Sequence, residues 1–129
     1  DGQKAEFLGE AAALLFPIDW PEPFGMVMIE AMACGTPILA FDRGSVREVI
    51  DEGVTGFIVD DVESAIAALP HVLALDRVRV RQQFDERFTA ASMATNYVDL
   101  YERAFATARR ASATARSEDV AVSHETLVN

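Results

Sequence analysis

Two glutamates, Glu22 and Glu30, stand eight positions apart in a segment whose residue types could bind an anionic ligand. Glu22 precedes Pro23, and a residue before proline is disfavoured in a helix, so we expect Glu22 in an extended loop. From Gly25 to Cys34 an almost wholly apolar run predicts a buried helix. The first backbone N–H groups of a helix have no partner inside it, and they lie at the positive end of its dipole. The segment therefore predicts an anion-binding site at Gly25, whose missing side chain lets a ligand approach the backbone.

Glu30 is the only polar side chain in this apolar run. Burying a carboxylate without a partner is costly, so Glu30 needs a donor, solvent or a ligand hydroxyl. It lies about 7 Å along the helix axis from Gly25, at a rise of about 1.5 Å per residue. The residues alone leave two interpretations open, namely a contact with a sugar hydroxyl of the ligand, or a solvent gap or structural arginine. For Glu22 alone they favour an exposed acid in a loop.

The elements that must position these residues follow from hydrophobic periodicity. Short apolar runs alternate with helical patterns, which predicts an α/β fold with a Rossmann-like parallel sheet flanked by helices. We expect strands over 13–16, 37–41 and 56–59, and helices over 4–10, 25–34, 45–50, 60–68, 70–75, 78–88 and 91–109. The loop that carries Glu22 then leaves the carboxyl end of the first strand, where open α/β sheets bind ligands.

Several residues are expected to end or stabilise these helices. Gly35 is a C-cap for the apolar helix, and Ser45 and Asp61 (with Asp60) are expected N-caps. Pro70 is expected to begin a new helix. In the last helix an apolar stripe at helical spacing predicts one buried face, formed by Tyr97, Leu100, Tyr101, Ala104 and Phe105. Residues 111–129 have no periodicity, so we expect a domain over 1–110 followed by a disordered tail.

Three strands are few for a doubly wound sheet, which usually has five or more. The sequence starts with Asp1, and we expect the missing strands to precede it. A sheet edge left unpaired in this way favours self-association.

Composition excludes several classes of function. The net charge of −10 would repel a nucleic-acid backbone. The single cysteine, Cys34, cannot form an intrachain disulfide, which favours a cytoplasmic location. The longest apolar stretch, 11–18, is far below the ~20 residues of a transmembrane helix. No G-x-G-x-x-G or P-loop motif is present, so we expect no cofactor, and His71 and His124 lack ligand-like neighbours, so we expect no metal.

The stretch Glu22-Pro-Phe-Gly, with Ile29-Glu30-Ala-Met-Ala-Cys-Gly-Thr-Pro after it, resembles the E-x7-E signature of retaining GT-B glycosyltransferases of family 4. The similarity continues through Gly44, 48–50 and 53–59, and returns at 87–88 and 97–101. Roughly the first 105 residues match, and the combined pattern is far more specific than two glutamates at a given spacing. The resemblance implies the donor-binding, C-terminal domain of such an enzyme in partial form.

The resemblance also implies roles for individual residues. Glu22, as the catalytic-site acid, would accept hydrogen bonds from hydroxyls of the donor sugar near the reacting carbon. Phe24, Gly25 and Met26 would offer backbone N–H groups to that sugar and to the diphosphate. Glu30 would hold the ribose hydroxyls of the nucleotide. The family transfers a sugar from a nucleotide-diphosphate sugar to an acceptor with retention and needs no metal held by the protein.

Some features of the family pattern are missing. The Arg and Lys that clamp the diphosphate have no match, and Lys4 stands too late in the pattern to be one of them. The acceptor-binding domain is absent, so we expect this chain alone to be inactive and to need that domain or a partner chain. Arg47 stands where many relatives carry proline, and we interpret it as a solvated loop residue. The alternatives are a non-catalytic remnant or subunit that binds a nucleotide sugar, and a nucleotide-sugar epimerase of the same fold.

Overall fold

The computed structural model describes the backbone of residues 2–125 and the side chains as far as Arg110. The chain divides into two compact units, Asp1–Thr89 and Ala90–Asn129. The elements of the first unit are α1 (Gly2–Glu10), β1 (Leu14–Phe16), α2 (Met26–Ala33), β2 (Ile38–Phe41), α3 (Val46–Val49), β3 (Gly56–Val59), α4 (Val62–Leu73) and α5 (Arg77–Arg87). The described part of the second unit is helix α6 (Ala90–Glu125).

The first unit is built on a parallel three-stranded sheet with the order β1-β2-β3. Ile38 at the start of β2 pairs with Leu14 on one side and with Gly56 on the other. All three strands lie where the apolar runs predict them, within a residue at either end. The predicted parallel sheet is therefore confirmed.

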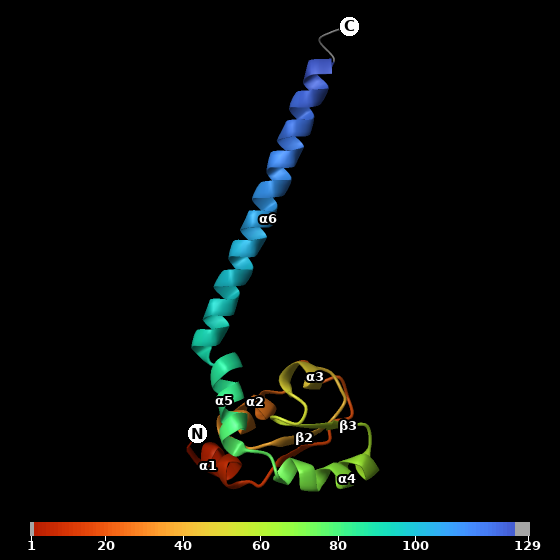
Figure 1. Ribbon diagram of the computed structural model, residues 1–129, viewed down its shortest axis with the longest axis vertical. Coiled ribbons are helices and arrows are strands. Elements are labelled where there is room, and N and C mark those ends of the chain that lie inside the picture. The colour runs from red at the N-terminus through yellow and green to blue at the C-terminus, as the bar shows by residue number, and fades with distance from the viewer. Residues whose placement is uncertain (1, 126–129) are drawn as a thin grey trace. The chain divides into compact units, whose positions relative to one another are not determined.

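Both faces of the sheet are covered, because alternate residues of β2 enter two separate hydrophobic clusters. Ile38 and Ala40 pack in a cluster that also contains buried residues of α1, α2 and α5. Leu39 packs in a second cluster with Val59 of β3 and Val72 of α4. The first unit is thus a sheet between two helical layers, with α4 on the face opposite to α2, as Figure 1 shows. This confirms the Rossmann-like α/β class.

Two cap predictions are confirmed by their hydrogen bonds, and a third is confirmed in position only. After α2, Gly35 donates to the carbonyl of Met32 and the next residue, Thr36, to that of Ala31, both at 2.9 Å, which is the Schellman pattern. Asp61 forms a capping box with Ser64 at the start of α4.

Ser45 is the N-cap residue of α3, as predicted, but its side chain makes no capping hydrogen bond. Its backbone is already helical (φ −76°, ψ −2°), whereas a capping side chain needs an extended backbone to reach the following N–H groups. Its buried Oγ has no hydrogen-bond partner among the residues that the structure describes.

The predicted break before Pro70 is wrong, because α4 runs without interruption from Val62 to Leu73. Proline removes a hydrogen bond to the preceding turn and so destabilises a helix interior. Here it lies in the last turn, and the fully buried Val72 two residues later anchors that turn in the core. Packing therefore outweighs the local preference.

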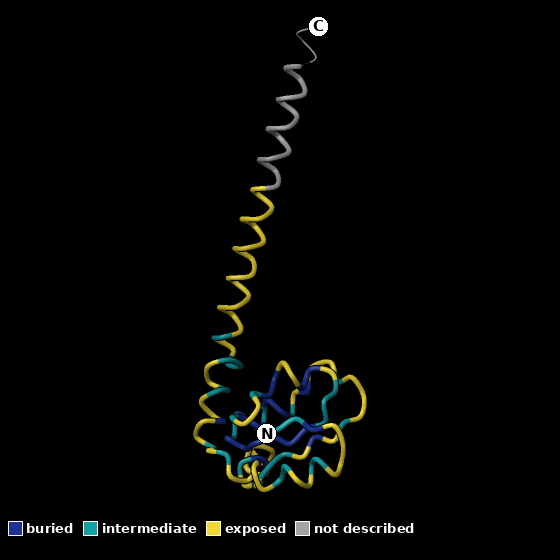
Figure 2. Tube along the Cα trace, turned by 45° about the vertical axis from the view of Figure 1, so that its right-hand side comes forward, coloured by how far each residue is buried: buried dark blue, intermediate teal, exposed yellow. Residues whose placement is uncertain are grey.

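Helix α6 begins where predicted and extends beyond the expected end at residue 109. Its stripe of Tyr97, Leu100, Tyr101 and Phe105 is exposed by 56 to 68%, so the prediction of a buried face is wrong (Figure 2). All described residues of this unit belong to this one helix, so they provide no second surface against which the stripe could pack. The expected disorder of 111–129 stays a prediction, since the side chains beyond Arg110 and all of 126–129 lie outside the described residues.

Among the described residues, no helix is both long and apolar enough to cross a membrane.

Candidate functional site

The loops that follow β1 and β2 meet at the carboxyl edge of the sheet. Gly44 lies so close to Glu22 that a Cβ built at Gly44 would be 2.3 Å from the Glu22 carbonyl oxygen, and its φ is +55°. The backbone N–H of Ser45 donates to that same carbonyl at 3.0 Å. Arg43 Nε also donates to Asp19 Oδ1 at 2.9 Å. The loop after β2 therefore holds the backbone of Glu22, the first candidate acid, in place.

The half-buried carboxylate of Glu22 folds back over the start of α2. Its Oε1 accepts from the backbone N–H of Gly25 at 3.4 Å, and its Oε2 accepts from Trp20 Nε1 at 3.3 Å. Both distances exceed the usual 2.7–3.2 Å for such a bond, so the two contacts are weak. A ligand hydroxyl can compete for either oxygen. Sequence reasoning missed Trp20, although the only tryptophan of the chain, two residues before Glu22, was a usable signal.

The first turn of α2 presents free backbone donors, as the sequence predicts. Gly25 is its N-cap, with φ +70°, and has no side chain to satisfy them. The N–H groups of Met26 and Val27 have no hydrogen-bond partner within the described part of the chain. The side chains of Phe24 and Met26 are exposed by 45% and 58%. Phe24, Gly25 and Met26 thus lie together with Glu22 at a helix end suited to an anion.

Glu30 lies farther along α2 among buried neighbours, and its side chain is 30% exposed. Its Oε1 accepts from Lys4 Nζ of α1 at 2.6 Å. The protein partner of Glu30 is thus a lysine, and not the structural arginine that the residues alone leave open. Sequence reasoning missed this pairing because 26 residues separate the two and no local pattern joins them.

Arg47 lies at the surface beside this edge. Its Nε and Nη2 both donate to Asp42 Oδ2, at 3.0 and 2.5 Å, and its side chain is 71% exposed. The hydrogen bond and the negative charge of Asp42 raise the pKa of the Arg47 guanidinium above its ordinary value. Arg47 is therefore an exposed residue held by one carboxylate, as expected, but it lies in helix α3 and not in a loop.

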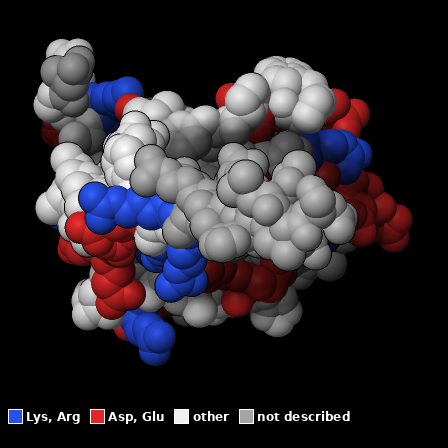
Figure 3. All heavy atoms as spheres, turned by 90° about the horizontal axis from the view of Figure 1, so that it is seen from above, with Lys and Arg blue, Asp and Glu red and all other residues white. Residues whose placement is uncertain are grey.

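Ion pairs of this kind recur over the molecule. On the face drawn in Figure 3, basic side chains lie next to acidic ones. Arg43 and Arg47 are already paired with Asp19 and Asp42 near the candidate site.

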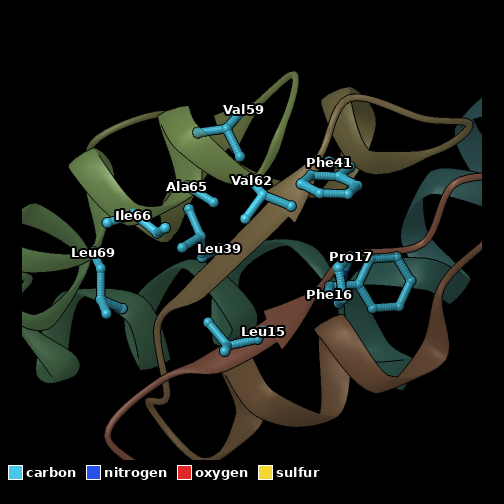
Figure 4. Close-up of a pocket in the computed structure, with 10 residues that line it drawn as sticks. All are labelled: Leu15, Phe16, Pro17, Leu39, Phe41, Val59, Val62, Ala65, Ile66 and Leu69. Atoms are coloured by element: carbon cyan, nitrogen blue, oxygen red, sulfur yellow. The ribbon is translucent and has the colours of Figure 1, made fainter.

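A separate groove of about 230 Å³ lies between α4 and the sheet (Figure 4). Its ten lining residues are all apolar: Leu15, Phe16, Pro17, Leu39, Phe41, Val59, Val62, Ala65, Ile66 and Leu69. A phosphorylated sugar needs hydrogen-bond donors, so this groove does not suit it. The carboxyl edge with its two glutamates and free N–H groups does.

Comparison with known proteins shows which family this chain is similar to. A family profile described as glycosyl transferases group 1 matches residues 1–89. Alpha-maltose-1-phosphate synthase of Mycobacterium tuberculosis is 32% identical over 116 residues, which cover 79% of this chain and 30% of that protein. Phosphatidyl-myo-inositol mannosyltransferase of Mycolicibacterium smegmatis is 37% identical over 81 residues, covering 61% of this chain and 21% of that protein.

Two solved structures have a similar fold, each with a TM-score of 0.60. Sucrose-phosphate synthase of Thermosynechococcus elongatus is 28% identical and is matched over 78% of this chain and 27% of its own. The Anabaena protein HepE in complex with UDP is 20% identical and is matched over 76% of this chain and 29% of its own. The chain thus spans less than a third of the length of these relatives.

These matches favour a transferase over the epimerase alternative, and they agree with the observed sheet, its two helical layers and the loops at its carboxyl edge. The chain belongs to the group 1 glycosyl transferases, a family with the GT-B fold.

Proposed function

We propose that this chain is the donor-binding part of a retaining glycosyltransferase of family 4. In this proposal a nucleotide-diphosphate sugar binds at the carboxyl edge of the sheet. The single observation that carries the proposal is the contact of the Glu22 carboxylate with the backbone N–H of Gly25, directly before the free N–H groups of Met26 and Val27 at the start of α2. A helix end with unpaired donors suits a diphosphate, and an adjacent carboxylate suits sugar hydroxyls.

Each residue has a defined task in the proposed complex. Glu22 accepts hydrogen bonds from hydroxyls of the donor sugar near the reacting carbon, exchanging its weak contacts with Trp20 and Gly25. The backbone of Phe24, Gly25 and Met26 faces the sugar and the diphosphate. Glu30 accepts from the ribose hydroxyls. During transfer, negative charge grows on the leaving diphosphate, and oriented N–H groups stabilise it.

An acceptor must be delivered by a second domain or a partner chain, because orientation of two substrates supplies much of the rate. We therefore propose that the 129-residue chain by itself binds the donor without transferring its sugar. The reported complex of HepE with UDP supports a nucleotide ligand for this fold. We also propose a cytoplasmic location, because the single cysteine forms no intrachain disulfide.

A thermal-shift panel with uridine, guanosine, adenosine and cytidine diphosphate sugars tests the proposal. Ligand at about 100 times its dissociation constant stabilises the folded state by about 2.7 kcal/mol, so one nucleotide class should raise the melting temperature. Glu30→Ala should reduce that rise in melting temperature. Arg79→Met, which replaces an exposed residue of α5, should leave the rise unchanged. No rise with any of the four donors would contradict the proposal.

A further inference from the structure

The structure links the ribose-binding glutamate of the proposed site to a second helix. Lys4 Nζ of α1 lies 2.6 Å from Glu30 Oε1 of α2, and Lys4 is the only lysine of the chain. We propose that Lys4 is a further positioning residue of the nucleotide subsite, which orients the Glu30 carboxylate toward the ribose hydroxyls and neutralises its charge. This inference rests on the proposed function.

Helix α1 is held firmly enough for Lys4 to act in this way. Leu8, one turn farther along α1, is 5% exposed in the core. Its carbonyl accepts from Thr36 Oγ1 at 2.6 Å. Arg77 of α5 donates to the carbonyls of Gly9 and Ala11 at 2.7 and 2.6 Å. Lys4 therefore reaches Glu30 from a fixed backbone.

The pairing contributes little to the stability of the fold, because Lys4 and Glu30 are 56% and 30% exposed and exposed ion pairs are weak. The pairing does restrict the orientation of the Glu30 carboxylate. One oxygen of Glu30 is taken by Lys4, while no protein group described in the structure donates to Oε2. A carboxylate has two oxygens with about four acceptor sites, so Oε2 remains for a hydroxyl pair. The ammonium keeps two further N–H groups with which to donate to a hydroxyl oxygen.

Charge gives the second reason for this role. The chain carries a net charge of −10, and the donor adds a diphosphate. An unpaired Glu30 would repel that anion. Arg43 and Arg47, which follow β2, are already paired with Asp19 and Asp42. Lys4 removes this repulsion at the carboxylate itself. Loss of one such charge-assisted contact should weaken binding by about 3- to 10-fold.

The test compares ribonucleotides with analogues that lack the ribose hydroxyls. The full chain is titrated with UDP, GDP and ADP and with their 2′,3′-dideoxy counterparts, and each dissociation constant is measured. Lys4→Met removes the charge at similar length, Lys4→Arg retains it, and Glu30→Gln alters the carboxylate. Arg79→Met on α5 is the matched control, because it removes one exposed positive charge elsewhere.

We expect Lys4→Met to weaken ribonucleotide binding by about 3- to 10-fold beyond its effect on the dideoxy form, as one lost charge-assisted contact predicts. Lys4→Arg should retain most of the preference, and Arg79→Met should leave the preference as in the unmodified chain. As a second measurement, the side-chain NMR signal of the only lysine should shift with the ribonucleotide and not with its dideoxy analogue. The melting temperature of each variant shows that it is folded.

The two possible failures can be told apart. In the first, the unmodified chain prefers ribonucleotides, Glu30→Gln removes this preference, and Lys4→Met keeps it. That result overturns the role of Lys4 and leaves the proposed function standing. If no nucleotide binds, or the unmodified chain does not distinguish the two forms, the proposed function is overturned and the role of Lys4 with it.

Discussion

At the scale of single residues, the two glutamates differ in what surrounds them. Glu22 lies in a loop and accepts two weak hydrogen bonds, whereas Glu30 lies on a helix and accepts one short bond from an ammonium group. Under the proposed function the first is beside the reacting sugar and the second beside the spectator ribose. Their substitutions should therefore have different kinetic effects.

In a longer chain that carries both domains, Glu22→Ala should lower kcat by about 100-fold with little change in nucleotide affinity, because contacts made at the reacting centre act on the transition state. Glu30→Ala should raise the donor KM by about tenfold, the effect of about 1.4 kcal/mol of lost binding energy. Steady-state kinetics with the donor varied would separate the two. Equal effects on nucleotide affinity, with kcat unchanged for both, would contradict the assignment.

At the scale of elements, the sequence was sufficient wherever a local pattern determines the structure. The strands follow from short apolar runs, and the end of α2 follows from Gly35. It was insufficient where tertiary contacts decide. Ser45 adopts a helical backbone, Pro70 is carried inside α4, and Lys4 reaches Glu30 across 26 residues. Both glutamates could be selected from the sequence, but their protein partners could not.

The position of α5 depends on one arginine. Arg77 donates to the carbonyls of Gly9 and Ala11 and to Thr36 Oγ1, at 2.6 to 2.8 Å, and so joins α5 to the end of α1. Arg77→Met would leave these acceptors without a donor and should lower the free energy of unfolding by about 2–3 kcal/mol. Urea denaturation measures this. Arg79→Met on the same helix should change it by less than about 0.5 kcal/mol, and an equal loss in both variants would rule out this role of Arg77.

The N-terminus of α4 should make the stability of the fold depend on pH. Hydrogen bonds from the side chain and then the backbone of Ser64 lower the pKa of Asp61 below its ordinary value of 3.8. A carboxylate whose pKa is lowered on folding stabilises the folded state above the unfolded pKa, and this contribution is lost as the pH falls through the folded pKa. Asp61→Ala should therefore reduce the melting temperature by a few degrees at pH 7 and by less below pH 3.8.

Asp61→Asn separates the hydrogen bond from the charge, because asparagine caps helices about as well as aspartate. It keeps the hydrogen-bond acceptor and lacks the charge, so at pH 7 it should melt between Asp61→Ala and the unmodified chain. Thermal melts at pH 7 and pH 3 are the measurement. A deficit of Asp61→Ala that is the same at both pH values would show that the charge contributes nothing.

At the scale of the whole molecule, the residues that the structure describes leave an apolar surface uncovered in each unit. In the first unit β1 is an edge strand, and its Leu15 is 59% exposed in the groove beside α4. In the second unit the stripe of α6 is exposed. Edge strands next to apolar surface favour association, so we expect the 129-residue chain to self-associate through the edge at β1.

Sedimentation at several protein concentrations tests which surface is responsible. Leu15→Lys places a charge beside the edge and should shift the chain toward the monomer. Phe105→Lys places the same charge on α6, where the exposed fraction is 68%, and should leave association unchanged. Dissociation by Phe105→Lys and not by Leu15→Lys would show that α6, and not the sheet, joins the copies.

The location of the ligand decides the central proposal. Backbone amide NMR signals of the isotope-labelled chain, followed during titration with the donor that raises its melting temperature, report that location directly. We expect the largest shifts at Phe24 to Val27 and at Glu30, because these groups surround the proposed diphosphate and ribose. Largest shifts at Leu15, Ile66 and Leu69 in the apolar groove, or no shifts at all, would contradict a donor site at the carboxyl edge of the sheet.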